Sequence, residues 1–189
     1  MGISRKMMYE LFSVAFKQFL IKDASSISNG VSERHLCARL GIQFEMLLSS
    51  YNLQAYYADA EYNRKQNGRI KTILSGELEV IPITCDLILH SRGERGRDNL
   101  IAIEMAKPDK SAERVHSDRL RLMALTKRSF DDVWSYDGKV HPEHVCGYLL
   151  GAFILIDSLK NLASVEFFED GAPIALRGEF SLGHPNSHP

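Results

Sequence analysis

The first fifty residues of the chain place their hydrophobic side chains at helical spacing. In residues 7–21 these side chains recur every three or four positions, which predicts a helix with one buried face. That face comprises Met8, Leu11, Phe12, Ala15, Phe16, Phe19 and Leu20. After a polar connection at 23–30, Ser32 is a typical N-cap for a second helix over residues 33–49. The apolar stripe of this second helix is Leu36, Leu40, Phe44, Leu47 and Leu48.

The middle of the chain consists of short apolar runs that are typical of strands. Residues 83–89 and 100–106 are almost continuously apolar, which indicates strands buried on both faces. The glycine-rich segment 91–99 between them favours a hairpin loop. A further strand is expected at 56–63, followed by a turn at 64–68.

The remaining segments complete an α/β pattern. Residues 71–80 predict either a short helix or an irregular excursion. Residues 111–130 predict a helix whose inward side chains are Leu120, Met123, Ala124 and Leu125. A strongly apolar strand is expected at 145–156 and a weaker edge strand at 163–168. The expected order of elements is two helices, three strands, one helix and two strands. This order predicts a mixed β-sheet with helices packed on it.

Two acidic residues interrupt the central apolar runs. Asp86 lies within residues 83–89, and Glu104 lies within residues 100–106. A carboxylate buried in such a strand must be hydrogen-bonded, protonated or bound to a cation. Two carboxylates on adjacent strands indicate a metal site, whereas either acid alone fits a structural hydrogen-bond network equally well.

Composition and charge narrow the functional classes. The chain has 189 residues and 44% apolar content, which predict a single domain. Its net charge of -1 excludes a uniformly basic nucleic-acid-binding protein. We expect a cytoplasmic protein without a membrane partner, because no apolar run reaches about 20 residues and the first residues do not form a signal peptide. Cys37, Cys85 and Cys146 have no CxxC spacing, which favours buried thiols over disulfides or a zinc site.

Several segments together resemble a known family of nucleases. They are Ser32-Glu33-Arg34-His35 at a helix start, residues 60–64 (AEYNR), residues 85–93 (CDLILHSRG) and residues 99–104 (NLIAIE), followed by Asp118-Arg119-Leu120 and Leu125-Thr126. Over residues 31–157 this series is similar to small bacterial members of the PD-(D/E)xK nuclease superfamily. The resemblance implies an α/β fold with a restriction-endonuclease-like mixed β-sheet flanked by helices. The expected organisation is an N-terminal helical segment at 1–30, a nuclease-like core at 31–180 and a C-terminal tail at 181–189.

The resemblance also implies a divalent-metal site for phosphodiester cleavage. Asp86 and Glu104 would ligate the ion, the backbone carbonyl of Met105 would add a ligand, and Glu33 would reach the ion directly or through water. Such an all-oxygen ligand set suits Mg²⁺ or Mn²⁺. The lysine of the family pattern is expected two residues after the glutamate, where this chain has Ala106.

Ala106 leaves three explanations open. The chain is an engineered inactive form, a natural pseudoenzyme, or an active enzyme in which Lys107 or Lys110 takes the role of the lysine. The first explanation is favoured at this point, because the other residues of the implied site are present. Lys107 is expected to point to the opposite strand face, since strand side chains alternate, unless a bulge redirects it.

Nucleic acid, with DNA favoured over RNA, is the partner that the resemblance implies. The candidate phosphate contacts are Arg64, His90, Arg92, Lys107 and Arg119. Each of these side chains fits an ordinary solvated surface equally well, and no segment is typical of a base-reading helix. Glu61 is placed near the site by the resemblance alone, and Asp118 matches the family without an assigned role.

Three functional hypotheses follow. The first is a Mg²⁺-dependent endonuclease acting on DNA, such as the effector of a bacterial defence or repair system, which is inactive or impaired in this chain through Ala106. The second is a noncatalytic binding module that kept the nuclease fold. The third is a regulatory subunit that associates with a protein partner or a second copy of the chain through Phe12, Phe16 and Phe19.

Overall fold

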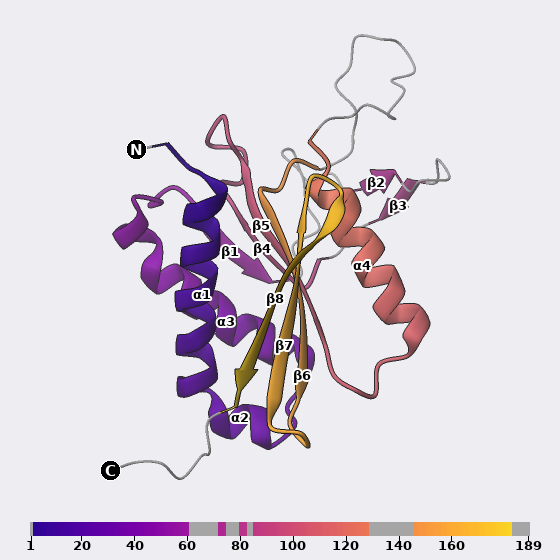
Figure 1. The fold of residues 1–189 in the computed structure, drawn as a ribbon. Helices are drawn as coiled ribbons and strands as arrows, with labels where there is room; N and C mark the ends of the chain where they lie inside the picture. The colour runs from indigo at the N-terminus through magenta and orange to yellow at the C-terminus, as the bar shows by residue number, and fades with distance from the viewer. Residues whose placement is uncertain (1, 61–71, 75–79, 83–84, 129–145, 183–189) are drawn as a thin grey trace.

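The structure of the chain is a computed structural model that describes residues 2–60, 72–74, 80–82, 85–128 and 146–182. Its helices are α1 (Arg5–Lys22), α2 (Ala24–Ser28), α3 (Glu33–Leu47) and α4 (Ala112–Thr126), with a 3₁₀ turn η1 (Leu48–Tyr51) after α3 (Figure 1). Its strands are β1 (Tyr57–Ala60), β2 (Thr72–Leu74), β3 (Val80–Pro82), β4 (Leu87–His90), β5 (Asn99–Ala106), β6 (Leu150–Asp157), β7 (Leu162–Glu169) and β8 (Ala172–Ser181).

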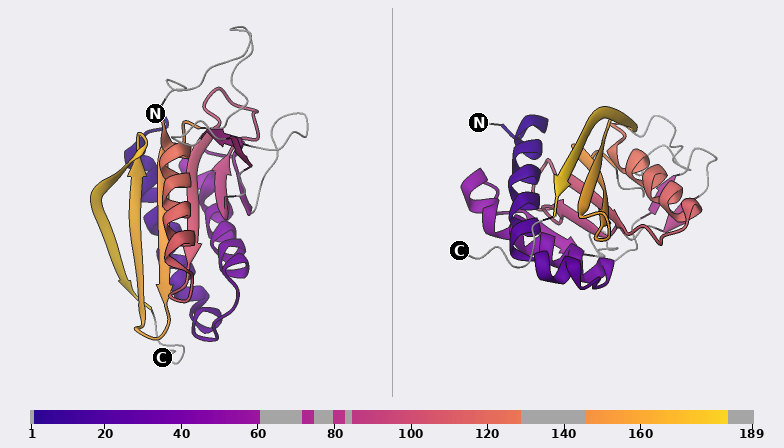
Figure 2. Two further views of the ribbon diagram at one scale, coloured as in Figure 1. Left: turned by 90° about the vertical axis from the view of Figure 1, so that its right-hand side faces the viewer. Right: turned by 60° about the horizontal axis from the view of Figure 1, so that its bottom comes forward.

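Six of these strands form one mixed sheet in the order β1-β4-β5-β6-β7-β8. β5 and β6 are parallel, and the other neighbouring strands of this sheet are antiparallel. α1 and α3 cover one face of the sheet, and α4 covers the other (Figure 1 and Figure 2). The prediction of an α/β fold with a mixed sheet and an N-terminal helix is therefore confirmed.

The N-terminal helix is built as its apolar periodicity predicts. α1 buries all seven of the predicted side chains, Met8, Leu11, Phe12, Ala15, Phe16, Phe19 and Leu20. Phe12 stands edge-on to Phe167 of β7, and Phe16 stands edge-on to Phe180 of β8. Phe12, Phe16 and Phe19 are completely buried, so the surface invoked for a partner in the third hypothesis is covered by the chain itself.

The second predicted helix begins where its cap indicates. The Ser32 hydroxyl accepts a hydrogen bond from the His35 backbone amide at 3.3 Å, which satisfies one of the free donors of the first turn of α3. Leu36, Leu40 and Phe44 are buried as predicted. The polar connection expected before this helix contains the short helix α2, which the sequence analysis missed.

Three predicted elements differ from the structure. Residues 72–74 and 80–82 form the antiparallel pair β2–β3, so neither a short helix nor an irregular segment is correct for them. β8 was not predicted, and because it pairs with β7, the predicted edge strand is an interior strand. The predicted inward face of α4 is confirmed at Leu125, which is buried, and at Met123 and Ala124, which pack against the same core cluster. It is wrong at Leu120, which is 49% exposed, and it omitted the buried Asp118, Leu122 and Thr126. The expected turn at 64–68 and the expected helix end at 130 lie outside the described residues.

The cysteines of the chain are all free thiols in the structure. Cys37 and Cys85 are buried as expected, and Cys146 is half-buried. Within the described residues, no helix is both long and apolar enough to cross a membrane.

Candidate active site

Asp86 and Glu104 come together because β4 and β5 are neighbouring antiparallel strands. Asp86 immediately precedes β4, one position before the Leu87–Ile103 pair of the two strands. Its Oδ2 accepts a hydrogen bond from the backbone amide of Met105 at 2.9 Å, which fixes the carboxylate beside the end of β5. The two acids therefore lie on adjacent strands, and the electrostatic repulsion between them affects the protonation of Glu104.

Glu104 is almost completely buried and is held by a cation from α4. Its side chain is 1% exposed, and its Oε1 accepts a hydrogen bond from Arg121 Nη1 at 2.6 Å. Burial raises the pKa of Glu104 well above its usual range, and the negative charge of Asp86 adds to this effect. The guanidinium of Arg121 acts in the opposite direction, because it favours the ionised carboxylate.

Lys110 joins acidic residues of α3 and α4 to the backbone of β5. Its Nζ lies 2.7 Å from Asp118 Oδ2 on α4 and 3.5 Å from Glu33 Oε2 on α3. The same ammonium donates a hydrogen bond to the backbone carbonyl of Met105 at 3.2 Å. Burial lowers the pKa of Lys110, but the carboxylates of Asp118, Glu33 and Asp86 outweigh this effect and raise it overall.

Ala106 and Lys107 lie on opposite faces of β5, as strand alternation predicts. Ala106 is completely buried in an apolar cluster that includes Cys85 and Leu122. Lys107 Nζ donates a hydrogen bond to the Gly30 carbonyl at 2.8 Å, and its backbone amide donates one to Glu33 Oε1 at 3.1 Å. Pairing of β5 with β6 is regular up to Ala106, so no bulge turns the Lys107 side chain toward Glu104.

Four carboxyl groups and two cations meet at this end of the sheet. We call this set the acidic cluster; it consists of Glu33, Asp86, Glu104, Asp118, Lys110 and Arg121. Its carboxylate and carbonyl oxygens are the ligands that Mg²⁺ and Mn²⁺ prefer, and the acids outnumber the cations by two. The described residues nevertheless contain no group of three or more His, Cys, Asp or Glu side chains arranged so that they could hold a metal ion.

Sequence reasoning left Asp118 without a role in the site and missed the contact of Arg121 with Glu104. Arg121 Nη1 contacts both Glu104 and Asp118, and the latter distance is 3.1 Å. Asp118 and Arg121 are three residues apart, a spacing that places two side chains on the same helix face. The spacing of Asp118 and Arg121 was the sequence signal for this part of the cluster. It points to Glu104 only because α4 packs against β5, which the sequence does not show.

Three of the five predicted phosphate contacts, His90, Arg92 and Arg119, contact carboxylates within the fold. His90 is 1% exposed, and its Nε2 lies 2.9 Å from Asp59 Oδ2, so the expectation of a surface histidine is wrong. Arg92 donates two hydrogen bonds to Asp59, at 2.8 and 2.6 Å. Arg119 donates two to Glu166, at 2.9 and 2.8 Å. Arg64, like Glu61, lies outside the described residues.

No protein-family model, curated protein or solved structure matches the chain. Its chemistry is therefore argued from its own residues. Those residues are two acids on neighbouring strands, a third acid at the start of α3, and a lysine whose ammonium reaches the carbonyl between Glu104 and Ala106.

Proposed function

We propose that the chain is a metal-dependent nuclease that hydrolyses phosphodiester bonds of DNA. The observation that carries this proposal is the convergence of Asp86, Glu104 and the Met105 carbonyl with the Lys110 ammonium. Asp86, Glu104, the Met105 carbonyl and Glu33 would hold the ion. A bound Mg²⁺ or Mn²⁺ polarises a phosphoryl oxygen and lowers the pKa of a water molecule.

The order of helices and strands around the acidic cluster supports the resemblance to the PD-(D/E)xK nuclease superfamily. A helix (α3) precedes three antiparallel strands (β1, β4 and β5), and α4 then precedes β6, which is parallel to β5. This order agrees with the restriction-endonuclease-like core that the sequence resemblance implies. We therefore assign the core of that fold to α3, β1, β4, β5, α4 and β6.

Lys110 is the residue to which we assign the role of the missing lysine. Its side chain is 13% exposed and lies among the carboxylates of Glu33 and Asp118. We infer that this ammonium, whose three N–H groups face Asp118, Glu33 and the Met105 carbonyl, orients a water molecule or a phosphate oxygen once the proposed ion takes over the carboxylate and carbonyl oxygens. A lysine side chain at position 106 would instead have to displace the apolar groups around a completely buried alanine. This contrast favours an active enzyme over an engineered loss of the lysine.

The test is cleavage of a panel of single- and double-stranded DNA and RNA with Mg²⁺, Mn²⁺ or EDTA. We expect metal-dependent cleavage of DNA by the chain as it stands, and a loss of about 100-fold or more in Lys110→Met. Lys17→Met is the matched control, because Lys17 is exposed on α1 and is not part of the acidic cluster. Activity that appears only in Ala106→Lys would show that position 106 is the true lysine position and would reject the role of Lys110.

A noncatalytic binding module is the second candidate function. It is favoured by the ion pairs of Lys110 and Arg121, which engage the carboxylates of Glu104, Glu33 and Asp118. For such a module, Mg²⁺ would not change the melting temperature and no variant would cleave nucleic acid. For the nuclease, Mg²⁺ binding should raise the melting temperature of the wild-type chain, because a ligand of the folded state stabilises it.

A further inference from the structure

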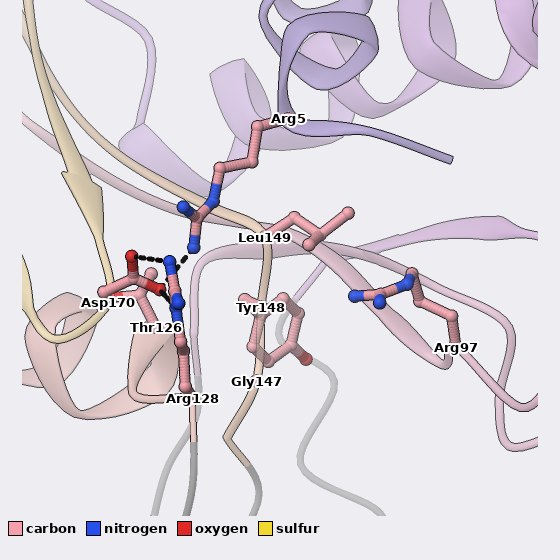
Figure 3. Close-up of a pocket in the computed structure, with 8 residues that line it drawn as sticks. All are labelled: Arg5, Arg97, Thr126, Arg128, Gly147, Tyr148, Leu149 and Asp170. Atoms are coloured by element: carbon pink, nitrogen blue, oxygen red, sulfur yellow. Dashed lines mark hydrogen bonds and ion pairs between the residues drawn. The ribbon is translucent and has the colours of Figure 1, made fainter. Parts of the chain in front are cut away.

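A second site of concentrated charge lies at the other end of β5, where arginine rather than acid prevails. It is a pocket of about 440 Å³ whose lining includes Arg5, Arg97, Arg128, Asp170, Tyr148 and Leu149 (Figure 3). Arg97 precedes β5, whereas Glu104 lies near the end of that strand, so roughly 20 Å of extended chain separates the pocket from the acidic cluster. The two sites are therefore distinct.

Two of the three arginines are held in place by carboxylates. Asp170, in the turn between β7 and β8, accepts hydrogen bonds from Arg5 and from two nitrogens of Arg128, with Arg128 Nη2 at 2.6 Å. Arg5 Nη1 also lies 3.4 Å from Glu169 Oε2. These contacts orient both guanidinium groups and still leave each of them with unused N–H donors, because a guanidinium carries five.

Arg97 supplies a third guanidinium group at the pocket. Its backbone carbonyl accepts a hydrogen bond from Tyr56 at 2.6 Å, which anchors the loop, but no carboxylate among the described residues pairs with its guanidinium. Figure 3 shows this guanidinium directed toward Tyr148 and Leu149, across the pocket from Arg5 and Arg128. Among the described residues at the pocket, three guanidinium groups therefore face the two carboxylates of Asp170 and Glu169.

We propose that this pocket binds a small phosphate monoester of nucleotide size. A phosphate monoester carries a charge of about -1.5 to -2 at neutral pH and accepts several hydrogen bonds, which matches converging guanidinium groups. Tyr148 and Leu149 provide an apolar wall for the rest of the ligand. The volume lies in the range of about 300–1,000 Å³ that is typical of small-molecule sites. This assignment does not depend on the nuclease proposal.

The test is isothermal titration calorimetry of the full chain with adenosine 5′-monophosphate, adenosine and inorganic phosphate. We expect the monophosphate to bind at least about tenfold more tightly than adenosine, and Arg97→Gln to weaken its binding by about tenfold or more, as for a lost charged hydrogen bond. Arg95→Gln is the matched control, since Arg95 is exposed on the same loop and does not line the pocket. Melting curves followed by circular dichroism should show that both variants are folded.

Three results would overturn the proposal. One is the absence of binding by the monophosphate at millimolar concentration. Another is equal weakening in Arg95→Gln and Arg97→Gln, which would indicate general attraction by a basic loop. The last is equally tight, Arg97-dependent binding of an oligonucleotide without a terminal phosphate, which would identify a site for the nucleic-acid backbone. Cleavage activity enters none of these comparisons, so a failed nuclease assay leaves the assignment of this pocket unaffected.

Discussion

At the scale of single residues, the acidic cluster places the buried carboxyl group of Glu104 beside the negative charge of Asp86. Burial and the neighbouring Asp86 raise the folded-state pKa of Glu104 above its unfolded value of about 4.3. When the folded-state pKa of a carboxyl group lies above its unfolded-state pKa, the unfolded chain loses the proton first as pH rises. The free energy of unfolding therefore falls between these two pKa values. The same carboxylate is the one that the proposed function requires.

Glu104→Gln should therefore stabilise the metal-free protein at neutral pH. The amide keeps a hydrogen-bond acceptor for Arg121 and removes the charge that faces Asp86, so we expect a gain of about 1 kcal/mol in the free energy of unfolding in EDTA. The gain should shrink toward pH 4.5, where the wild-type carboxyl binds a proton. Urea unfolding at several pH values measures both effects. Glu10→Gln, at an exposed position on α1, should change neither; a loss of stability in Glu104→Gln at pH 7 would contradict this account.

Asp59 shows the opposite dependence on pH. Burial opposes its ionisation, but the hydrogen bonds from Arg92 and His90 outweigh burial and hold the pKa of Asp59 below its usual range. Its contribution to stability is thus present above about pH 4 and is lost as pH falls through the folded-state pKa. Asp59→Asn should cost about 1–2 kcal/mol at pH 7 and much less at pH 3, measured by urea unfolding. Asp109→Asn, at an exposed site, is the control, and a cost that does not depend on pH would argue against the ion-pair explanation.

At the scale of elements, the packing of α4 on β6 depends on a glycine. A Cβ at position 151 would lie 3.0 Å from both Phe168 Cβ and Thr126 Cγ2, which are not flexible side-chain ends. Gly151→Ala should therefore destabilise the protein by about 1–3 kcal/mol through overpacking. Gly96→Ala is the matched control, because a Cβ there would meet nothing within 4 Å. Thermal unfolding of both variants tests this prediction. Equal melting temperatures for Gly151→Ala and Gly96→Ala would show that α4 can move away from the sheet at little cost in free energy.

The same elements show how far sequence reasoning reaches. The buried face of α1 was predicted completely because large apolar side chains define it and no polar residue interrupts it. The buried face of α4 was not, because Asp118 is buried by pairing with Lys110 and Arg121, and no hydrophobic periodicity reveals such a pairing. β8 was missed since most of its side chains are exposed. For the candidate site, the acids on β4 and β5 were visible as interruptions of apolar runs, but their cationic partners depended on the tertiary position of α4.

At the scale of the whole molecule, α1 and the sheet form one buried cluster and should unfold together. Phe16 is completely buried and lies beside Phe12, Phe19 and Phe180, with its ring centroid 5.1 Å from that of Phe180 on β8. Phe16→Ala should cost about 3–5 kcal/mol, because the cavity lies between the helix and the last strand. Calorimetry should show a single transition at a lower temperature, whereas Val14→Ala, at a position 37% exposed, should stay within about 0.5 kcal/mol of the wild type. If Phe16→Ala instead produced two transitions, with the later one unchanged in temperature, residues 1–30 would be a segment that folds separately from the rest of the chain.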